Sequence, residues 1–493
     1  MRREENGKRT GDLAVGNRIL RLDNVRKTVN YLKKNGLSGT FYAAAERMQE
    51  ERSAAPYRYQ PPGEEALEAQ RKKTGEGACL FSIVTPAYET GETYLREMIS
   101  SVQAQSYPRW ELVIADASAG SGVENTVNRI IHETGDMRIR YSRLSENRGI
   151  AENTNAGIAL AKGDYIALLD HDDFITPDAL YEMAEAVRRG RQNGCAPALV
   201  YSDEDKYDDA SKTFENPHVK QEFNLDLILS NNYICHFMAV EAGLMKRLML
   251  RGEYDGAQDY DLVLRVVDSI WPSGTRLPCA GRIVHIPKVL YHWRSHRDST
   301  ALNTASKSYA YEAGKRALAD FCERRGFSAQ VTHSLHLGFY HIAYDPDILR
   351  VRQDVGLVGG RLLNRRRKIF AGAYDEQGHI LFSGLPARFT GGSTHRAALL
   401  QDCAAVDIRC VQVREELRPV FSQITGLPYR ERSLYGKGRL ENREIRIADV
   451  TGLACDEAGY RKLSMALGEA ARREGYLVVW DPSASCEESE WKR

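Results

Sequence analysis

The chain has 493 residues, 42% of them hydrophobic and 27% charged, so two or three domains are expected and disorder throughout is excluded. The 68 Lys and Arg balance the 67 Asp and Glu, which argues against nucleic acid as a partner. No apolar run approaches the ~18 residues that span a bilayer, and the first residues lack the apolar segment of a signal peptide. The nine cysteines form no Cys-x-x-Cys pair and are odd in number, so we expect a reducing cytoplasm.

Residues 1–76 predict a helical arm and a linker. Within residues 17–34, apolar side chains recur every three or four positions: Ile19, Leu22, Val25, Val29 and Leu32. Asn35-Gly36 is expected to end this helix. Residues 1–36 carry ten Lys and Arg against four Asp and Glu, a net charge of +6. The helix could lie on anionic lipid at the inner face of the cell membrane, or it could dock on the domain that follows. Residues 58–77 read as a linker with a short helix.

Residues 77–330 begin with alternating strand and helix patterns. Strands are predicted at 80–88, 110–118, 139–145 and 164–173, and helices at 93–107, 124–135, 149–163 and 177–190. We expect Gly163 to close the third helix and Pro177 to lie in the first turn of the fourth. This order is typical of the α/β class, with a Rossmann-like, mainly parallel sheet between flanking helices. Residues 201–300 read as irregular, with charged and aromatic clusters, before a helix at 308–326.

Residues 331–493 predict a smaller α/β region. Strand patterns lie at 355–363 and 476–481, and a helix pattern lies at 456–475.

Polar side chains follow all four strands of the predicted sheet, where such sheets bind ligands. They are Pro86, Tyr88 and Glu89 after the first strand, Asp116 after the second, Arg148 after the third, and Asp170, Asp172 and Asp173 after the fourth. Asp116 could accept a hydrogen bond from a base or ribose, and Arg148 could meet phosphate. The alternatives are a loop cap and a surface arginine.

The Leu-Leu-Asp-His-Asp-Asp run at 168–173 is the sharpest signal. Three carboxylates in four residues repel one another, so a cation is expected to compensate them. A divalent metal bound by one or two carboxylates and a substrate's phosphates fits this pattern. The alternative is a helix N-cap, but we expect Thr176 to fill that position.

Three later clusters also carry candidate residues. Asp203, Glu204 and Asp205 could bind sugar hydroxyls or order the shell around a metal, or they could form a solvated turn. Asp259 precedes a helical stripe, where a charged carboxylate can accept a proton or simply cap the helix. Trp293 could stack on a ligand and His296 could contact a diphosphate or metal, unless both belong to an aromatic loop.

These motifs resemble glycosyltransferase family 2, which has the GT-A fold. The similar stretches are FSIVTPAYE, ELVIADAS, ENRGIAENTNAGIALAKGDYIALLDHDD, YSDEDK, NNYICH, GAQDYDLVLR and HIPKVLYHWRSH, in the expected order over residues 80–300. The relatives that come nearest are bacterial enzymes of cell-surface polysaccharide synthesis, including rhamnose-rich polymers. The resemblance implies an inverting hexosyl or rhamnosyl transfer from a nucleotide-diphospho-sugar to a glycan or lipid-linked acceptor, with Mg²⁺ or Mn²⁺.

The resemblance also assigns roles to single residues. Pro86, Tyr88 and Glu89 would line the nucleotide pocket, Asp116 would bind the base, and Arg148 would lie near the diphosphate. Asp170-His171-Asp172 matches the D-x-D element, with Asp172 as the direct metal ligand and His296 as a further contact. Asp259 matches the catalytic base of the E-D motif, although Gln258 stands where that motif has glutamate.

Residues 350–493 resemble the later part of a second module of this family. They lack a second nucleotide loop, a second L-D-x-D-D element and a second Q/E-D site, so we expect a truncated, non-catalytic domain that serves in homodimer formation or acceptor placement. Two other functions are compatible with the α/β domain at residues 77–330. A nucleotidyltransferase needs a Gly-rich basic loop after its first strand, whereas TPAYETGE has one Gly and no Lys or Arg. A non-catalytic sugar- or lipid-binding scaffold would not need Asp172 and Asp259 intact.

Overall fold

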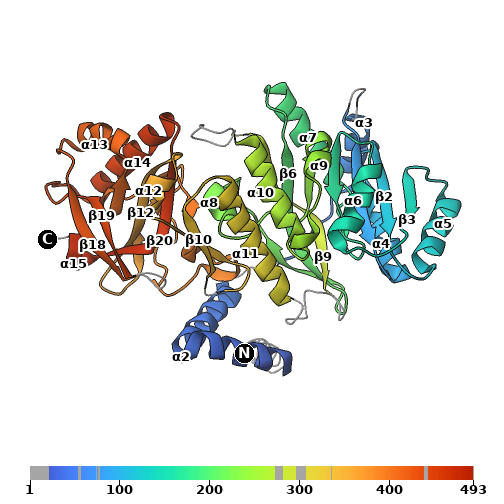
Figure 1. The fold of residues 1–493 in the computed structure, drawn as a ribbon, viewed down its shortest axis with the longest axis horizontal. Coiled ribbons are helices and arrows are strands. Elements are labelled where there is room, and N and C mark those ends of the chain that lie inside the picture. The colour runs from blue at the N-terminus through green and yellow to red at the C-terminus, as the bar shows by residue number, and fades with distance from the viewer. Residues whose placement is uncertain are drawn as a thin grey trace, which may run out of the picture.

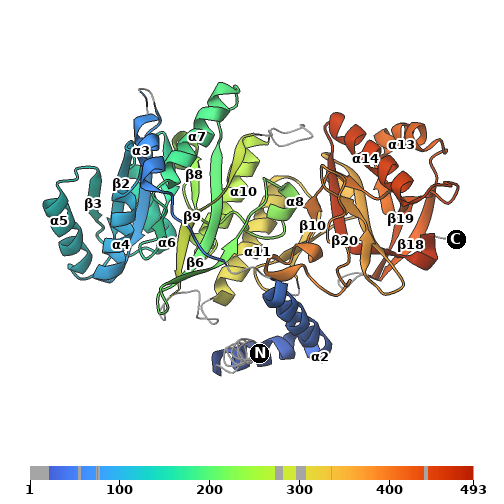
Figure 2. The same cartoon turned by 180° about the vertical axis from the view of Figure 1, so that it is seen from behind.

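The computed structural model describes residues 22–53, 57–73, 75, 78–271, 281–295, 307–334, 336–437 and 442–491. A large α/β unit with a nine-stranded sheet lies beside a smaller α/β unit, and a helical arm projects from the junction between them (Figures 1 and 2). None of the helices in the described part of the chain combines the length and the apolar character that a bilayer crossing needs.

The first half of the large unit follows the predicted order of strands and helices. Its elements are β1 (Phe81–Ala87), α4 (Glu92–Gln103), β2 (Trp110–Asp116), α5 (Gly122–Thr134), β3 (Ile139–Arg143), α6 (Ile150–Leu160), β4 (Tyr165–Leu168) and α7 (Ala179–Gln192). The strands pair in parallel in the order β3-β2-β1-β4. β2 is buried throughout, because helices cover both faces of the sheet. The α/β, GT-A-like fold class is confirmed.

Three local predictions in this half are wrong. Helix α6 ends at Leu160, so Gly163 does not close it. Instead, a Cβ at Gly163 would lie 2.6 Å from the Ser82 nitrogen, so glycine lets two backbone segments approach closely. Helix α7 is preceded by Asp178 as its N-cap residue, and the Thr176 hydroxyl donates to Asp178 Oδ1 over 2.7 Å. Thr176 is therefore not the cap, and Pro177 precedes the helix.

Residues 201–300, which were expected to be irregular, complete the large sheet. They contribute β6 (Leu199–Asp208), β7 (Thr213–His218), β8 (Met238–Glu241) and β9 (Ile283–Ser295), while β5 (Phe174–Ile175) pairs with β9. β8 is antiparallel to β4 and β6, whereas β6 and β9 are parallel. The strands were missed because their charged side chains pair with one another inside the fold, as Asp205 does with His292 over 2.6 Å.

Helices and a hairpin cover this half of the sheet. They are α8 (Leu225–Ile228), α9 (Ala242–Leu248), α10 (Gln258–Ile270), α11 (Lys307–Arg324), β10 (Ala329–His333) and β11 (Tyr340–Tyr344). The predicted helix at 308–326 is thus confirmed as α11.

The C-terminal unit is built on a five-stranded sheet. Its elements are α12 (Ile348–Val351), β12 (Val355–Leu363), β13 (Ile369–Ala371), β14 (Ala373–Tyr374), β15 (Gln401–Asp402), β16 (Ala405–Val406), β17 (Val411–Val413), α13 (Arg418–Thr425), β18 (Glu431–Lys437), β19 (Asn442–Ala448), α14 (Glu457–Arg473), β20 (Leu477–Glu487) and α15 (Glu488–Trp491). The sheet order is β13-β12-β20-β15, with β17 also on β12, and β12 and β20 are parallel. The predicted strands and helix are present as β12, β20 and α14.

A buried ion network joins the two units. Arg352 has no exposed side-chain surface and pairs with Asp226 of the large unit at 3.0 Å and with Asp354 at 2.6 Å. The apolar core of the large unit also continues into β12 and β20 through Val358 and Val479. The two units therefore share one continuous interior.

The N-terminal arm consists of α2 (Leu22–Ser53), which is interrupted at Gly36, and α3 (Glu64–Lys73). Gly36 adopts a φ of 69°, so the first helical segment ends at the predicted position, but a second segment follows directly. The second segment docks on the C-terminal unit, where the Glu46 carboxylate accepts hydrogen bonds from the backbone of Thr390 and Gly391 at 2.8 and 2.6 Å. Ile19 lies outside the described residues.

Candidate active site

The carboxyl ends of β1 and β2 hold one wall of the site. The parallel register sets Ala87 beside Asp116, and the loops that follow are tied together. Ser118 Oγ accepts the backbone N–H of Glu89 over 2.8 Å, and Glu89 Oε1 accepts that of Ala119 over 2.8 Å. These bonds give the loop around Glu89 a fixed shape, with Tyr88 half exposed beside it.

Asp116 is fully buried at the end of β2. One carboxylate oxygen accepts the Tyr141 hydroxyl at 2.7 Å and the other accepts the Ser118 N–H at 2.9 Å. Each carboxylate oxygen has a second lone pair, so these bonds leave acceptor capacity. Arg148, by contrast, is largely exposed and lies 3.5 Å from Glu146.

Acidic side chains from distant parts of the chain meet beyond the end of β4. Asp170 is raised in pKa by desolvation and by the negative charges of Asp172 and Asp259, while His236 opposes the shift. Asp172 and Asp259, 87 positions apart, therefore both act on one carboxyl group. The third acid of the run is directed elsewhere, because Asp173 accepts hydrogen bonds from the Tyr291 hydroxyl and the Arg294 N–H.

Asp259 lies in the first turn of α10. Its Oδ2 accepts a hydrogen bond from Asn232 Nδ2 over 2.8 Å. The neighbouring Gln258 accepts the Gly256 N–H over 2.7 Å, and Asp261 pairs with Arg265 at 2.8 Å. Asp259 is the carboxylate of this turn whose negative charge raises the pKa of Asp170.

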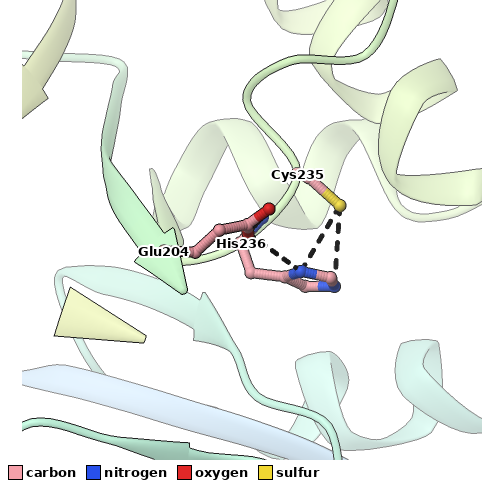
Figure 3. Close-up of side chains that lie close together, drawn as sticks. All are labelled: Glu204, Cys235 and His236. Carbon is pink, nitrogen blue, oxygen red and sulfur yellow. Dashed lines mark hydrogen bonds and ion pairs between the residues drawn. The ribbon is translucent and has the colours of Figure 1, made fainter. Parts of the chain in front are cut away.

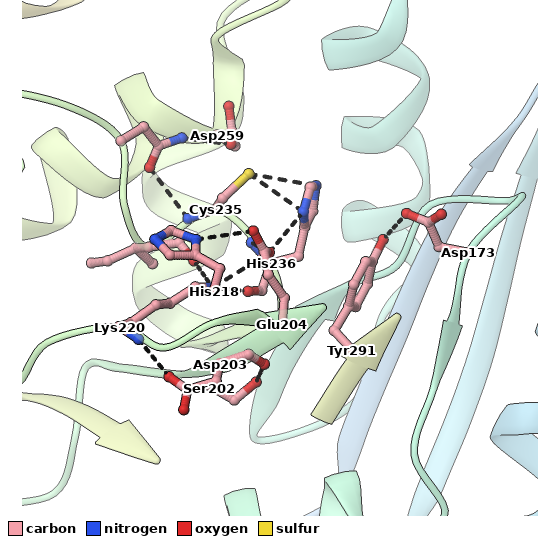
Figure 4. A network of polar contacts seen from close by, with 12 residues as sticks. Asp173, Ser202, Asp203, Glu204, His218, Lys220, Cys235, His236, Asp259 and Tyr291 are labelled. Atoms are coloured by element: carbon pink, nitrogen blue, oxygen red, sulfur yellow. Dashed lines mark hydrogen bonds and ion pairs between the residues drawn. The ribbon is translucent and has the colours of Figure 1, made fainter. Parts of the chain in front are cut away.

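Three further residues complete the cluster; Glu204 was a candidate from the sequence, whereas the other two were not. They are Glu204 on β6 and Cys235 and His236 in the segment before β8 (Figures 3 and 4). His236 Nδ1 lies 3.2 Å from Glu204 Oε2, and its Nε2 lies 3.8 Å from Asp170 Oδ2. The signal was present in the NNYICH stretch, but nothing local linked it to β6 or to the Asp170 run.

Buried Lys220 holds this segment in place. Its ammonium donates to the backbone oxygens of Ile234 and His236 and lies 3.4 Å from Glu204. Burial works against charge on Glu204, but the positive charge of Lys220 and the hydrogen bonds with His218 and His236 together keep the pKa of Glu204 well below its usual range. Glu204 is thus a negative charge fixed next to His236.

Asp203 and Asp205 do not join the cluster. Both are almost fully buried, where Asp203 pairs with His285 at 2.8 Å and Asp205 with His292 at 2.6 Å. Glu204 lies between them on the strand and faces the other side, since side chains alternate along β6. The acids also do not form the solvated turn that was the alternative.

The aromatic residues of β9 reach the cluster from the far side. Tyr291 stacks on His236 with ring centroids 4.8 Å apart, and the Trp293 ring lies 5.9 Å from His236. Trp293 is therefore close to His236, and its stacking on a ligand stays a prediction. His296 lies outside the described residues.

The donor set fits a hard divalent cation. Asp170 and Asp172 offer carboxylate oxygens, which Mg²⁺ and Mn²⁺ prefer. Burial and, after it, the negative charges of Asp172 and Asp259 raise the pKa of Asp170, and a cation bound here would offset both effects.

The geometry is that of an α/β enzyme with acids grouped at the carboxyl edge of its sheet. Residues 82–248 match the model of the family Glycosyl transferase family 2. The chain is 36% identical to uncharacterized protein y4gI of Sinorhizobium fredii over 50% of this chain and 26% of that protein. It is 35% identical to the O-antigen biosynthesis protein RfbC of Myxococcus xanthus, over 51% of this chain and 19% of that protein. It is 27% identical to the putative colanic acid biosynthesis glycosyl transferase WcaA of Escherichia coli, over 47% of this chain and 85% of that protein.

The chain spans about a quarter or less of the length of the first two of these relatives. Among solved structures, TarS of S. aureus with UDP-GlcNAc is similar at a TM-score of 0.37 and 17% identity, over 49% of this chain and 66% of that one. The mannosyltransferase PcManGT of Pyrobaculum calidifontis, in complex with GDP-Man and Mn²⁺, is similar at a TM-score of 0.37 and 14% identity, over 61% of this chain and 86% of that one.

Proposed function

We propose that the chain is an inverting, metal-dependent glycosyltransferase that acts in the synthesis of a cell-surface polysaccharide. Its donor is a nucleotide-diphospho-sugar, its acceptor a glycan or lipid-linked sugar, and the transferred group a hexosyl or rhamnosyl residue. The observation that carries the proposal is that one segment brings Asp170 and Asp259 to the same edge of the sheet: its His236 lies 3.8 Å from Asp170, and its Asn232 donates a hydrogen bond to Asp259. The names of RfbC and WcaA support a polysaccharide product.

Asp259 is the proposed base. Its carboxylate accepts the proton of the acceptor hydroxyl as that oxygen attacks the anomeric carbon from the face opposite the diphosphate. A new C–O bond forms, the bond to the diphosphate breaks, and its electron pair leaves with the nucleoside diphosphate. Asn232 orients the Asp259 carboxylate through its 2.8 Å hydrogen bond.

Asp172 and Asp170 are proposed to hold Mg²⁺ or Mn²⁺, which when bound neutralises the charge of the leaving diphosphate. Pro86, Tyr88 and Glu89 would line the nucleotide pocket, Asp116 would accept from the base, and Arg148 would reach the diphosphate. The fixed loop around Glu89 and the exposure of Arg148 support these roles.

Replacement of the proposed base gives a direct test. We expect Asp259→Asn to lower the rate of sugar transfer at least ~1,000-fold while donor affinity stays within about twofold, because the amide keeps the shape but accepts no proton. Donor binding by calorimetry and transfer by product analysis check the two parts. Transfer at the normal rate by Asp259→Asn would exclude Asp259 as the base.

A second test concerns the metal. We expect Asp172→Ala to abolish the gain in nucleotide affinity that Mn²⁺ gives to the unchanged protein, while affinity without metal stays the same. Glu124→Gln, which changes an exposed carboxylate after β2, is the matched control. A protein that binds no nucleotide-sugar with or without Mn²⁺ would favour the non-catalytic scaffold instead.

Residues 331–493 are proposed to be a non-catalytic domain that helps to place the acceptor. A hollow of about 640 Å³, its open mouth included, lies where this region meets the end of the large unit. Its lining includes polar side chains that can bind sugar hydroxyls and an aromatic ring that can contact an apolar sugar face. The polar residues are His341, Arg361 and Asp481, and the aromatic residue is Phe389. Lower affinity for acceptor, with donor affinity unchanged, is expected for Phe389→Ala.

The arm is proposed to contact an anionic membrane surface. Beyond Gly36, Leu37, Phe41 and Met48 share one helical face and are 81%, 68% and 47% exposed, while Glu46 anchors the opposite face. This apolar stripe follows the basic segment of net charge +6. The double variant Leu37→Ser and Phe41→Ser should co-sediment less with phosphatidylglycerol vesicles than the unchanged protein does. If the unchanged protein is a dimer and the double variant is a monomer, this helical face binds a second copy of the chain instead.

A further inference from the structure

Glu204, Cys235 and His236 offer three ligand atoms of different chemistry within 4.8 Å of one another (Figure 3). Cys235 Sγ lies 3.4 Å from His236 Nδ1, which lies 3.2 Å from Glu204 Oε2. Ligands held at about 2.0–2.3 Å by one tetrahedral Zn²⁺ lie roughly 3.3–3.6 Å apart. The three side chains therefore already stand near the spacing that such an ion requires.

The histidine ring is oriented as a metal ligand would be. Its Nε2 lies 3.8 Å from the Asp170 carboxylate and 3.6 Å from Cys235 Sγ, whereas its Nδ1 lies 3.2 Å from Glu204 and 3.4 Å from Cys235 (Figure 4). Metal-bound histidines commonly direct their second nitrogen to a carboxylate, which fixes the ring. Tyr291, whose ring is nearly parallel at 9°, further restricts rotation.

We propose that Glu204, Cys235 and His236 form a binding site for a thiophilic transition metal of the Zn²⁺ class, separate from the Mg²⁺ or Mn²⁺ position assigned to Asp172. A thiolate, an imidazole and a carboxylate select Zn²⁺ or Co²⁺ over the hard cations, which prefer oxygen ligands alone. Three protein ligands leave the fourth tetrahedral position open to water. Sugar transfer as proposed above uses none of these three side chains.

The site has a consequence for the neighbouring segment. Asn232, which bonds to Asp259, lies three residues before Cys235, and Asn232 Oδ1 accepts the Cys235 N–H at 3.3 Å. An ion held by Cys235 and His236 thus tethers the backbone that positions Asn232. Metal occupancy is thereby linked to the geometry of Asp259.

The test uses Co²⁺ alone, added to the metal-free, tag-free full chain under reducing conditions. The expected result is a near-ultraviolet thiolate-to-cobalt charge-transfer band that saturates at one Co²⁺ per chain and disappears on addition of Zn²⁺. Cys235→Ser should abolish the band. Cys195→Ser, in the loop after α7, should keep it and serves as the matched control.

Two more variants keep the result decisive. His236→Gln should weaken Zn²⁺ binding in calorimetry at least tenfold even if Cys235→Ser proves unstable, whereas Asp172→Ala should leave the cobalt band unchanged. No band at saturating Co²⁺, with Cys235 shown by thiol titration to be reduced, would overturn the proposal. A band that survives Cys235→Ser would do the same, and neither outcome would affect the proposed sugar transfer.

Discussion

The amide of Asn232 donates a hydrogen bond to the carboxylate of Asp259 over 2.8 Å. In the sequence motif, the residue expected to support the aspartate is the one directly before it, and here that residue is Gln258. The structure directs Gln258 to the Gly256 N–H instead. The support for Asp259 therefore comes from a segment 27 positions earlier in the chain.

Removal of Asn232 should therefore impair catalysis. A hydrogen bond to a charged group contributes about 1.5–3 kcal/mol, so Asn232→Ala should lower kcat roughly 10- to 100-fold if the bond persists in the transition state. Gln258→Ala should change kcat less than about threefold. Steady-state kinetics with a fixed donor checks both variants, and equal losses in the two would contradict this assignment.

The junction between the two units depends on Arg352. Its guanidinium is fully buried against Asp226 and Asp354, so Arg352→Met leaves two buried carboxylates without their cation. Removing one partner from such a buried pair costs about 3–5 kcal/mol of unfolding free energy. Urea unfolding followed by fluorescence measures the loss.

Arg350 provides a control for this experiment. It lies two residues away, its side chain is 77% exposed, and it is 3.6 Å from Asp347. Arg350→Met should change the unfolding free energy by less than about 0.5 kcal/mol. A comparable loss in both variants would show that the burial of Arg352 does not matter.

Stability should depend on pH through His395. Burial and the positive charge of the stacked His336 lower the pKa of His395 to about 3. The unfolded chain binds this proton near pH 6.5 and the folded chain does not, so stability is complete above pH 6.5 and declines as the pH falls toward 3. At pH 5 the loss is at most about 2 kcal/mol.

In His395→Gln, the unfolding free energy should fall less between pH 6.5 and pH 5 than it does in the unchanged protein. Urea midpoints measured at several pH values test this, with His379→Gln as the control, because the His379 side chain is 75% exposed. An unchanged slope in His395→Gln would mean that other groups cause the acid sensitivity.

The arm should be released by loss of one carboxylate. Glu46 accepts hydrogen bonds from the backbone N–H groups of Thr390, Gly391 and Gly392 at 2.6–2.9 Å. Glu46→Ala removes all of them, so the linker at 57–63 should be cleaved by a protease at least about tenfold faster. The cleavage rate, followed by mass spectrometry, is the measurement.

Glu64→Ala is the matched control, since Glu64 is an exposed residue of α3 that pairs with Arg71. In Glu64→Ala, residues 57–63 should be cleaved at the same rate as in the unchanged protein. If Glu46→Ala is cleaved no faster, the contact with Thr390 does not hold the arm.

Much of the large unit followed from local patterns. The strands β1 to β4 are short apolar runs that end in polar residues, and the helices between them carry apolar stripes at helical spacing, so their order predicted a parallel sheet. The polar residues at the strand ends, among them Asp116 and Asp172, were also predictable, because ligands bind at that edge.

Local patterns failed where buried charges pair across the fold. β9 and the part of β6 after Tyr201 looked irregular because Asp203, Asp205 and their histidine partners are polar yet buried. No spacing in the sequence reveals that His285 meets Asp203, or that Glu204 meets His236.

By itself, the sequence determined which residues are chemically able to act and which strand ends carry them, since both depend on side-chain type and short-range periodicity. Only the tertiary structure decided that Asn232 supports Asp259, that His236 stands between Glu204 and Asp170, and that the arm rests on the C-terminal unit. These contacts join segments far apart in the chain. Such pairings are set by how the sheet and helices pack, which no local pattern encodes.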